Sequence, residues 1–327
     1  WLRVYEDTGA EVLLVDLDES GATDDYAATN LYGAPLIDYT GYYTSTLEAM
    51  GVTYDYWDVW TRSAPPRAVL DQYDKVVVYT GDYGGTGRIS GGIYLLDTLE
   101  ANDMRNYLAG GGKLLVFGQD ALGDGLIVSN ALAPSDALAS YMRGADNVPL
   151  LDGVFPATLP QPSIVGIEDF NPFLKDVILD LSAGGNGAGN QNRVDEVDWI
   201  NFVDLDTRPL FEVTNVVTGT VESGYVATRS SYEPTIERVK NPIGVPQEPV
   251  SWRVAFFGFG LEGVNDDTGY STREDLLSAV FDWLDDDVTV AFDDASYFAA
   301  EAFSFVEFAA TMTSTLGGDD IVYRWDF

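Results

Sequence analysis

The side chains able to do chemistry in this chain are almost all carboxylates. Its 327 residues include 53 Asp and Glu, but no Cys and no His. A Ser-His-Asp triad, a Cys-His pair and a zinc site built from His or Cys are therefore excluded. What remains is the chemistry of carboxylates, which bind divalent cations or act in pairs as acids and bases.

One acidic segment near the N-terminus has oxygen-bearing side chains at alternate positions ahead of a glycine, as a calcium-binding loop does. The predicted calcium ligands are Asp16, Asp18, Ser20, Asp24 and Asp25. Counted from Asp16, the twelfth position is Ala27, where an EF-hand has a bidentate glutamate. The alternative is an acidic turn at the end of a strand, without a metal.

Two further sets of acidic residues could have other roles. The run Asp285-Asp286-Asp287, with Asp293 and Asp294, either binds calcium at a domain junction or forms a solvated linker, which we favour. Asp120 and Glu262 would form an acid/base pair if the fold brought them together. That pair is the one route to hydrolysis that this composition leaves open.

Two other features invite a functional interpretation and are better explained by structure. The glycine-rich segment 80–92 lacks the lysine of a phosphate-binding loop, so we expect no nucleotide there. A group of aromatic residues could stack on sugars, but its helical and alternating spacing predicts packing between a helix and a strand. The group consists of Tyr39, Tyr42, Tyr43, Tyr54, Tyr56, Trp57 and Trp60.

The charge of the chain limits its partners and surroundings. The formal net charge is −36 and the pI is about 4.1, so the surface should repel nucleic acid and anionic lipid. No run of 18 apolar residues is present, which argues against membrane insertion. A salty or calcium-containing medium would screen such a surface. We therefore expect an extracellular or cell-surface location.

The elements that must position these carboxylates alternate between strand and helix. Strands are predicted at 11–15, 52–57, 75–79, 113–117, 209–214, 224–230 and 252–258, and helices at 38–50, 95–108, 135–142 and 271–284. Ser271 is the predicted N-cap of the last helix, with Glu274 completing a capping box. The glycine-rich tract 182–192 is predicted to be an exposed loop. This alternation predicts an α/β fold with a doubly wound, flavodoxin-like, mostly parallel sheet.

The pattern changes after residue 286, which gives two predicted domains, 1–286 and 287–327. The second contains only predicted strands, at 288–292, 303–313 and 321–327. Three strands cannot close a β-sandwich, so this immunoglobulin-like part is predicted to be incomplete. We expect it to become ordered only by pairing with further strands, supplied by more chain or by a neighbouring molecule.

The order of several segments resembles a glutamine-amidotransferase-like, ThuA-like domain over residues 11–286. The segments are VLLVD at 12–16, YY at 42–43, YDYWD at 54–58, YDKVVVY at 73–79, GGKLLVFGQD at 111–120 and GFGLE at 258–262. The tail, ending in YRWDF at 323–327, resembles the first half of a PKD domain. The amidotransferase cysteine would fall within FGQDA at 117–121, where no nucleophile is present. The resemblance therefore implies the fold without the activity.

The resemblance also implies a setting, because such domains occur in large secreted proteins that often carry a subtilisin-like peptidase. We expect a non-catalytic interaction or spacer module of a secreted multidomain cell-surface protein, with other domains of the same polypeptide as partners. The chain begins at Trp1, which we interpret as a piece of a longer protein. One alternative is a structural subunit of a filament or surface layer, a homo-oligomer assembled by strand complementation. The other is a carboxylate-dependent hydrolase.

Overall fold

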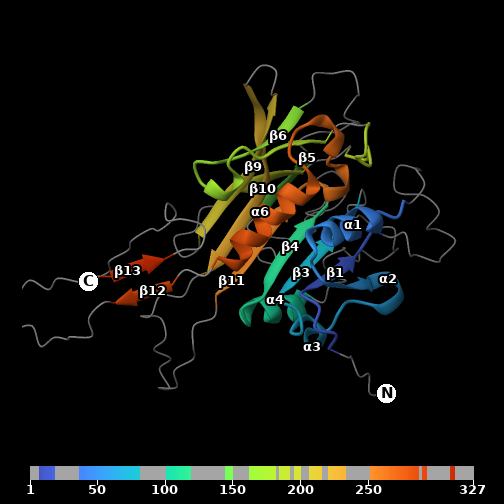
Figure 1. Cartoon of the computed structure of the whole chain (residues 1–327), viewed down its shortest axis with the longest axis vertical. Coiled ribbons are helices and arrows are strands. Elements are labelled where there is room, and N and C mark those ends of the chain that lie inside the picture. The colour runs from blue at the N-terminus through green and yellow to red at the C-terminus, as the bar shows by residue number, and fades with distance from the viewer. Residues whose placement is uncertain are drawn as a thin grey trace, which may run out of the picture.

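The computed structural model describes residues 7–18, 37–81, 101–118, 144–149, 162–181, 184–191, 195–199, 206–215, 220–232, 251–286, 289–292 and 310–313 (Figure 1). The predicted helix at 135–142 and the predicted strand at 321–327 lie outside these residues.

The structure is built on one mixed sheet of nine strands. Its first part is parallel and runs in the order β2 (Tyr54–Asp58), β1 (Val12–Asp16), β3 (Lys75–Tyr79), β4 (Lys113–Phe117) and β11 (Trp252–Phe257). Its second part is antiparallel and adds β10 (Thr220–Tyr232), β9 (Asp206–Asn215), β6 (Pro162–Gly166) and β7 (Ile178–Asp180). The prediction of an α/β fold with a large sheet is confirmed, and its parallel character holds for the first part.

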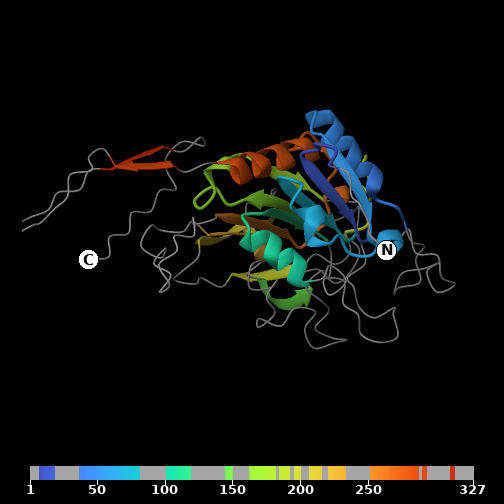
Figure 2. The ribbon, with the colours of Figure 1, turned by 90° about the horizontal axis from the view of Figure 1, so that it is seen from below.

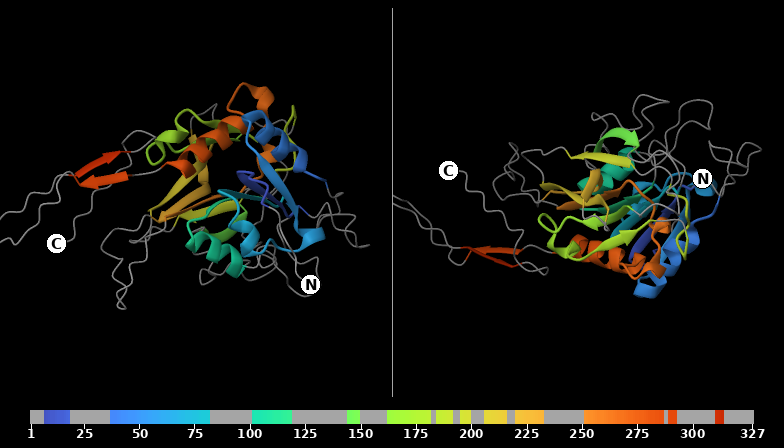
Figure 3. Two further views of the ribbon diagram at one scale, coloured as in Figure 1. Left: turned by 60° about the horizontal axis from the view of Figure 1, so that its bottom comes forward. Right: turned by 90° about the horizontal axis from the view of Figure 1, so that it is seen from above.

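Helices cover both faces of the parallel part, as a doubly wound sheet requires (Figures 2 and 3). On one face, α1 (Thr40–Met50) and α6 (Arg273–Asp285) bury Tyr43, Leu47 and Leu277 against alternate residues of the strands. On the other face, α3 (Arg67–Leu70) and α4 (Ala101–Ala109) bury Leu70 and Leu108 against the intervening residues. A short helix, α2 (Val59–Arg62), follows β2.

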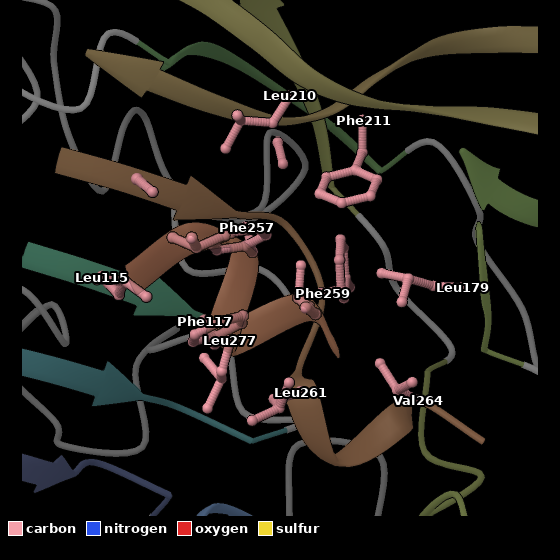
Figure 4. Packing of buried hydrophobic residues seen from close by; sticks show 14 of the residues in the cluster. Leu115, Phe117, Leu179, Leu210, Phe211, Phe257, Phe259, Leu261, Val264 and Leu277 are labelled. Atoms are coloured by element: carbon pink, nitrogen blue, oxygen red, sulfur yellow. The ribbon is translucent and has the colours of Figure 1, made fainter. Parts of the chain in front are cut away.

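The core beneath α6 is rich in phenylalanine (Figure 4). The rings of Phe117 and Phe257 are stacked with centroids 4.3 Å apart, and Phe259 meets Phe257 edge to face at 5.6 Å. These residues come from β4, β11 and the segment after β11, so the core fixes the positions at which those strands end. Leu261 and Val264 belong to the same cluster.

The predicted N-terminal cap of the last helix needs correction. The N-cap of α6 is Thr272, which forms the capping box with Asp275, one residue later than predicted for Ser271 and Glu274. The Ser271 hydroxyl instead accepts a hydrogen bond from the N–H of Ile178 at 3.2 Å, which fastens the edge strand β7. The chain therefore uses the first hydroxyl for tertiary contact and the second for the cap.

The middle of the chain contains strands that were not predicted. In addition to β6 and β7, β5 (Gly144–Pro149) pairs antiparallel with β8 (Asp195–Trp199). These strands have three to six residues and several contain proline, glycine or acids. Such sequences have low β-propensity, so it is their sheet neighbours that make them strands.

The C-terminal part shows one hairpin of the predicted second domain. β12 (Thr289–Phe292) pairs antiparallel with β13 (Ala310–Thr313) in a two-stranded sheet separate from the nine-stranded one. These two strands fall within the predicted strands at 288–292 and 303–313, of which residues 288 and 303–309 lie outside the described residues. Within the described residues, no helix has the length and apolar character needed to cross a bilayer.

Candidate functional site

The carboxyl ends of the parallel strands are where an open α/β sheet binds ligands, particularly where the strand order reverses. Here the order reverses between β1 and β3, since the chain passes from β1 to β2 on one side and then to β3 on the other. Asp16 is the last residue of β1, and Glu262 follows β11 at the same edge. These two carboxylates are the centres of two polar clusters.

The first cluster contains Asp16, Asp18 and Asp38, each offering a carboxylate oxygen within 4.8 Å of the others. Asp16 and Asp18 are 2% exposed, whereas Asp38 lies on the surface just ahead of α1. The structure thus brings together two of the predicted calcium ligands. The other three, Ser20, Asp24 and Asp25, lie outside the described residues.

Asp38 was missing from the predicted ligand set, although it stood at the start of the predicted helix 38–50. Its position explains why it was missed. It reaches the cluster because α1 begins beside the end of β1, and a sequence does not show that adjacency. The signal available was an acid immediately before a helix that follows a strand.

Hydrogen bonds hold the two buried carboxylates of this cluster. Asp16 accepts from the Tyr56 hydroxyl and, at 3.3 Å, from Thr40 Oγ1. Asp18 Oδ2 accepts from the backbone N–H of Tyr39 at 2.9 Å. Burial and the hydrogen bond to Asp16 raise the pKa of Tyr56 above its ordinary value. The Tyr56 hydroxyl therefore remains a donor at neutral pH.

The second cluster surrounds Glu262, whose side chain is fully buried. Its carboxylate accepts hydrogen bonds from the Tyr43 hydroxyl at 2.7 Å, from Asn190 Nδ2 at 2.9 Å and from Gln191 Nε2 at 3.3 Å. Burial and the nearby Glu262 charge raise the pKa of Tyr43 well above its ordinary value. The three donors satisfy the hydrogen-bonding capacity of the buried carboxylate oxygens. Asp120, the predicted partner of Glu262, lies outside the described residues.

The loop that supplies two of these donors was predicted to be exposed. Residues 184–186 and 189 are exposed, but Asn190 and Gln191 are 9% and 2% exposed. The loop is fastened to the segment after β11, because the Ala188 N–H donates to the Glu262 main-chain oxygen at 2.8 Å and Gln191 Oε1 accepts from the Gly260 N–H at 2.9 Å. The prediction failed because it treated the polar amides as solvent-facing, whereas a buried carboxylate requires such donors.

The two clusters are joined by stacked tyrosines. The rings of Tyr43 and Tyr79 lie 4.1 Å apart, and the Tyr79 hydroxyl is 2.7 Å from Thr40 Oγ1 in the first cluster. The prediction that the aromatic group packs in the core is confirmed for Tyr39, Tyr43 and Trp57, which are buried. Tyr42 and Tyr54 are partly buried against the same core. Tyr56 is 39% exposed, and the side chain of Trp60 lies outside the described residues.

The glycine-rich segment begins at the same edge with Thr80 and Gly81, and residues 82–92 lie outside the described part. Thr80 is fully buried, and a Cβ placed on Gly118 would come within 1.8 Å of its Oγ1. The turn after β4, where the resemblance places an amidotransferase nucleophile, is thus closely packed at Gly118.

At the opposite edge, Asp285 does not belong to a solvated linker. It forms ion pairs with Lys75 at 2.8 Å and with Lys113 at 2.6 Å. Burial alone would raise the pKa of Asp285, but the hydrogen bonds from Lys113 and Lys75 lower it below its ordinary value. Asp286, the next residue of the predicted junction site, is the C-cap of α6 and is buried. Asp287, Asp293 and Asp294 lie outside the described residues.

Comparisons with known proteins give no family and only distant structural likenesses. No family model and no curated protein matches the sequence. A protein from Bacteroides uniformis described as ThuA-like is 12% identical over 86% of this chain and 94% of its own, with a TM-score of 0.41. A β-galactosidase from Bacillus circulans sp. alkalophilus is 12% identical over 87% of this chain and 34% of its own, with a TM-score of 0.42. A β-galactosidase from Rahnella sp. R3 is 10% identical over 83% and 30%, with a TM-score of 0.40.

Proposed function

We propose that this chain is a non-catalytic interaction or spacer module of a secreted multidomain cell-surface protein. The observation that carries the proposal is the buried hydrogen-bond network of Glu262. An acid/base carboxylate must reach the substrate. Glu262 is fully buried and its oxygens are taken by Tyr43, Asn190 and Gln191 of the same chain.

The composition supports the same proposal. Without Cys and His, the cysteine nucleophile and the histidine base of Ser-His-Asp and Cys-His hydrolases are missing. The net charge of −36 suits a surface held in a salty medium, where counterions screen repulsion between carboxylates. An accessory role beside a subtilisin-like peptidase of the same polypeptide fits this proposal.

The location is tested by proteinase treatment of intact source cells, followed by immunoblotting for this chain. A cell-surface module should be removed while a cytoplasmic marker stays intact. Full protection of the chain on intact cells, with digestion only after lysis, would contradict the proposal.

The proposed module binds calcium at Asp16, Asp18 and Asp38. Carboxylate oxygens within 4.8 Å of one another are the ligands that Ca²⁺ prefers, and a cation would offset their mutual repulsion. At a calcium concentration 100-fold above Kd, the free energy of unfolding should rise by about 2.7 kcal/mol. Differential scanning calorimetry with CaCl₂, against NaCl of equal ionic strength, measures the rise.

The variant that tests this site is Asp38→Asn, because the side chain is exposed and an asparagine oxygen can still accept from the Thr40 N–H. Its calcium response should fall by at least half. The control is Asp71→Asn, which removes an exposed ion pair with Arg67. Equal responses to NaCl and CaCl₂, or an unchanged response in Asp38→Asn, would show that calcium acts only by screening.

The alternative function is a subunit of a filament or surface layer, and the separate β12–β13 hairpin is the observation that favours it. A two-stranded sheet is marginally stable alone. In dilute monomer the amides of Thr289–Phe292 should exchange quickly with deuterium, and assembly should protect them. Strong protection in the dilute monomer would contradict strand complementation between chains.

A further inference from the structure

Three basic residues form a row across the amino ends of three adjacent strands. Lys75 of β3 is in register with Lys113 of β4, and Lys113 is in register with Arg253 of β11. Residues in register on parallel strands share a face, and strands are about 4.8 Å apart. Three like charges at this spacing repel one another. Glu11 offsets part of this repulsion, because its Oε1 lies 2.8 Å from Lys75 Nζ. The rest of the row requires a further negative group against it.

The C-terminal end of α6 lies against this row. Asp285 gives one oxygen to each lysine, Oδ1 to Lys113 at 2.6 Å and Oδ2 to Lys75 at 2.8 Å. The Arg253 guanidinium donates to the main-chain oxygens of Trp283 and Asp286. The last carbonyls of a helix lack partners within it and carry its negative dipole end. The last turn of α6 has no basic residue of its own, so the sheet supplies the cations.

Aromatic side chains partly shield these contacts from water. The Lys75 side chain is 2% exposed, and its Nζ lies 5.3 Å from the ring centre of Phe281. The Trp283 ring lies 5.8 Å from the Arg253 guanidinium and 5.4 Å from that of Arg229. Asp285 itself is 47% exposed, which limits the strength of its pairs. The main-chain contacts of Arg253 are buried.

We propose that Lys75, Lys113 and Arg253, together with Asp285 and the last carbonyls of α6, form a mechanical clamp. This inference rests on the proposed spacer function, because a spacer between other domains of one polypeptide transmits any force that acts between them. A pull on the end of an unclamped helix breaks its hydrogen bonds one after another. With the clamp, a force applied to the chain beyond residue 286 acts simultaneously on β3, β4 and β11, the central strands of the sheet.

The experiment is an optical-trap measurement on residues 1–327 held by handles at its two ends. In the unsubstituted chain, α6 should unfold together with the nine-stranded sheet in one step. In Asp285→Asn, α6 should detach first and at lower force. The 13 residues of α6 then form about 45 Å of extended chain, at roughly 3.5 Å per residue, where the helix spans about 20 Å.

Arg253→Lys is the second clamp variant, because it keeps the charge but loses the fork that holds two carbonyls. Circular dichroism would confirm that each variant is folded before pulling. The control is Asp71→Asn, which should pull like the unsubstituted chain because its pair with Arg67 is exposed. A single step at unchanged force in both clamp variants would overturn the clamp, as would early detachment of α6 in the unsubstituted chain. Neither result depends on whether the chain has a catalytic activity.

Discussion

Replacing Glu262 with alanine should lower the free energy of unfolding by about 3 kcal/mol. The substitution leaves the buried donors of Tyr43 and Asn190 without their acceptor, and each buried unsatisfied group costs about 1–3 kcal/mol. The loop 184–191 should also loosen, because Gln191 loses one of its contacts. Urea unfolding followed by tryptophan fluorescence measures the change.

The matched control is Glu168→Ala. The Glu168 side chain is 55% exposed, and its Oε1 lies 3.7 Å from Lys175 Nζ. A surface pair of this kind should contribute less than about 1 kcal/mol. If Glu262→Ala were as stable as the unsubstituted chain, or more stable, Glu262 would not have the structural role assigned to it. Added stability is a typical result of replacing a carboxylate that is kept for function.

Replacing Gly260 with alanine should destabilise the unsubstituted chain but not the Glu262→Ala variant. The Gly260 φ and ψ of −87° and 139° suit any residue, so the backbone does not need glycine. A Cβ at this position would, however, lie 1.9 Å from Glu262 Oε1. Gly260→Ala should therefore cost roughly 2–3 kcal/mol by displacing the carboxylate.

In the Glu262→Ala background the same substitution should be neutral, or should stabilise by about 0.5 kcal/mol, because alanine restricts the unfolded chain more than glycine does. A double-mutant cycle measures this coupling directly. If the two changes in unfolding free energy were additive, the space occupied by the Glu262 side chain would not be the reason why position 260 requires glycine.

The parallel strands could be predicted because they are local patterns. β3 and β4 occupy the predicted residues, since Lys75–Tyr79 and Lys113–Phe117 are apolar runs buried on both faces of the sheet. The end of α1 was equally local, because Gly51 adopts the left-handed conformation of a helix C-cap. The antiparallel strands β6 and β7 were missed because nothing within their few residues distinguishes them from loops.

The site was predicted only where its residues follow a strand. Asp16 ends β1 and Asp18 follows two residues later, so their place at the edge of the sheet could be inferred. Asp38 reaches Asp16 across 22 residues of chain, and Asn190 reaches Glu262 across 72. Such contacts depend on tertiary packing, which leaves no periodic pattern in the sequence.

The measurement that tests the non-catalytic role most directly is a comparison of turnover by the purified chain and by its Glu262→Gln variant. The variant keeps the shape of the side chain and removes its carboxylate. Both proteins would be incubated at equal concentration with chromogenic esters, glycosides and phosphate esters and with glutamine, and circular dichroism would confirm that both are folded. We predict rates equal to buffer for both proteins. Turnover by the unsubstituted chain that the folded variant loses would contradict the proposal and make Glu262 a catalytic residue.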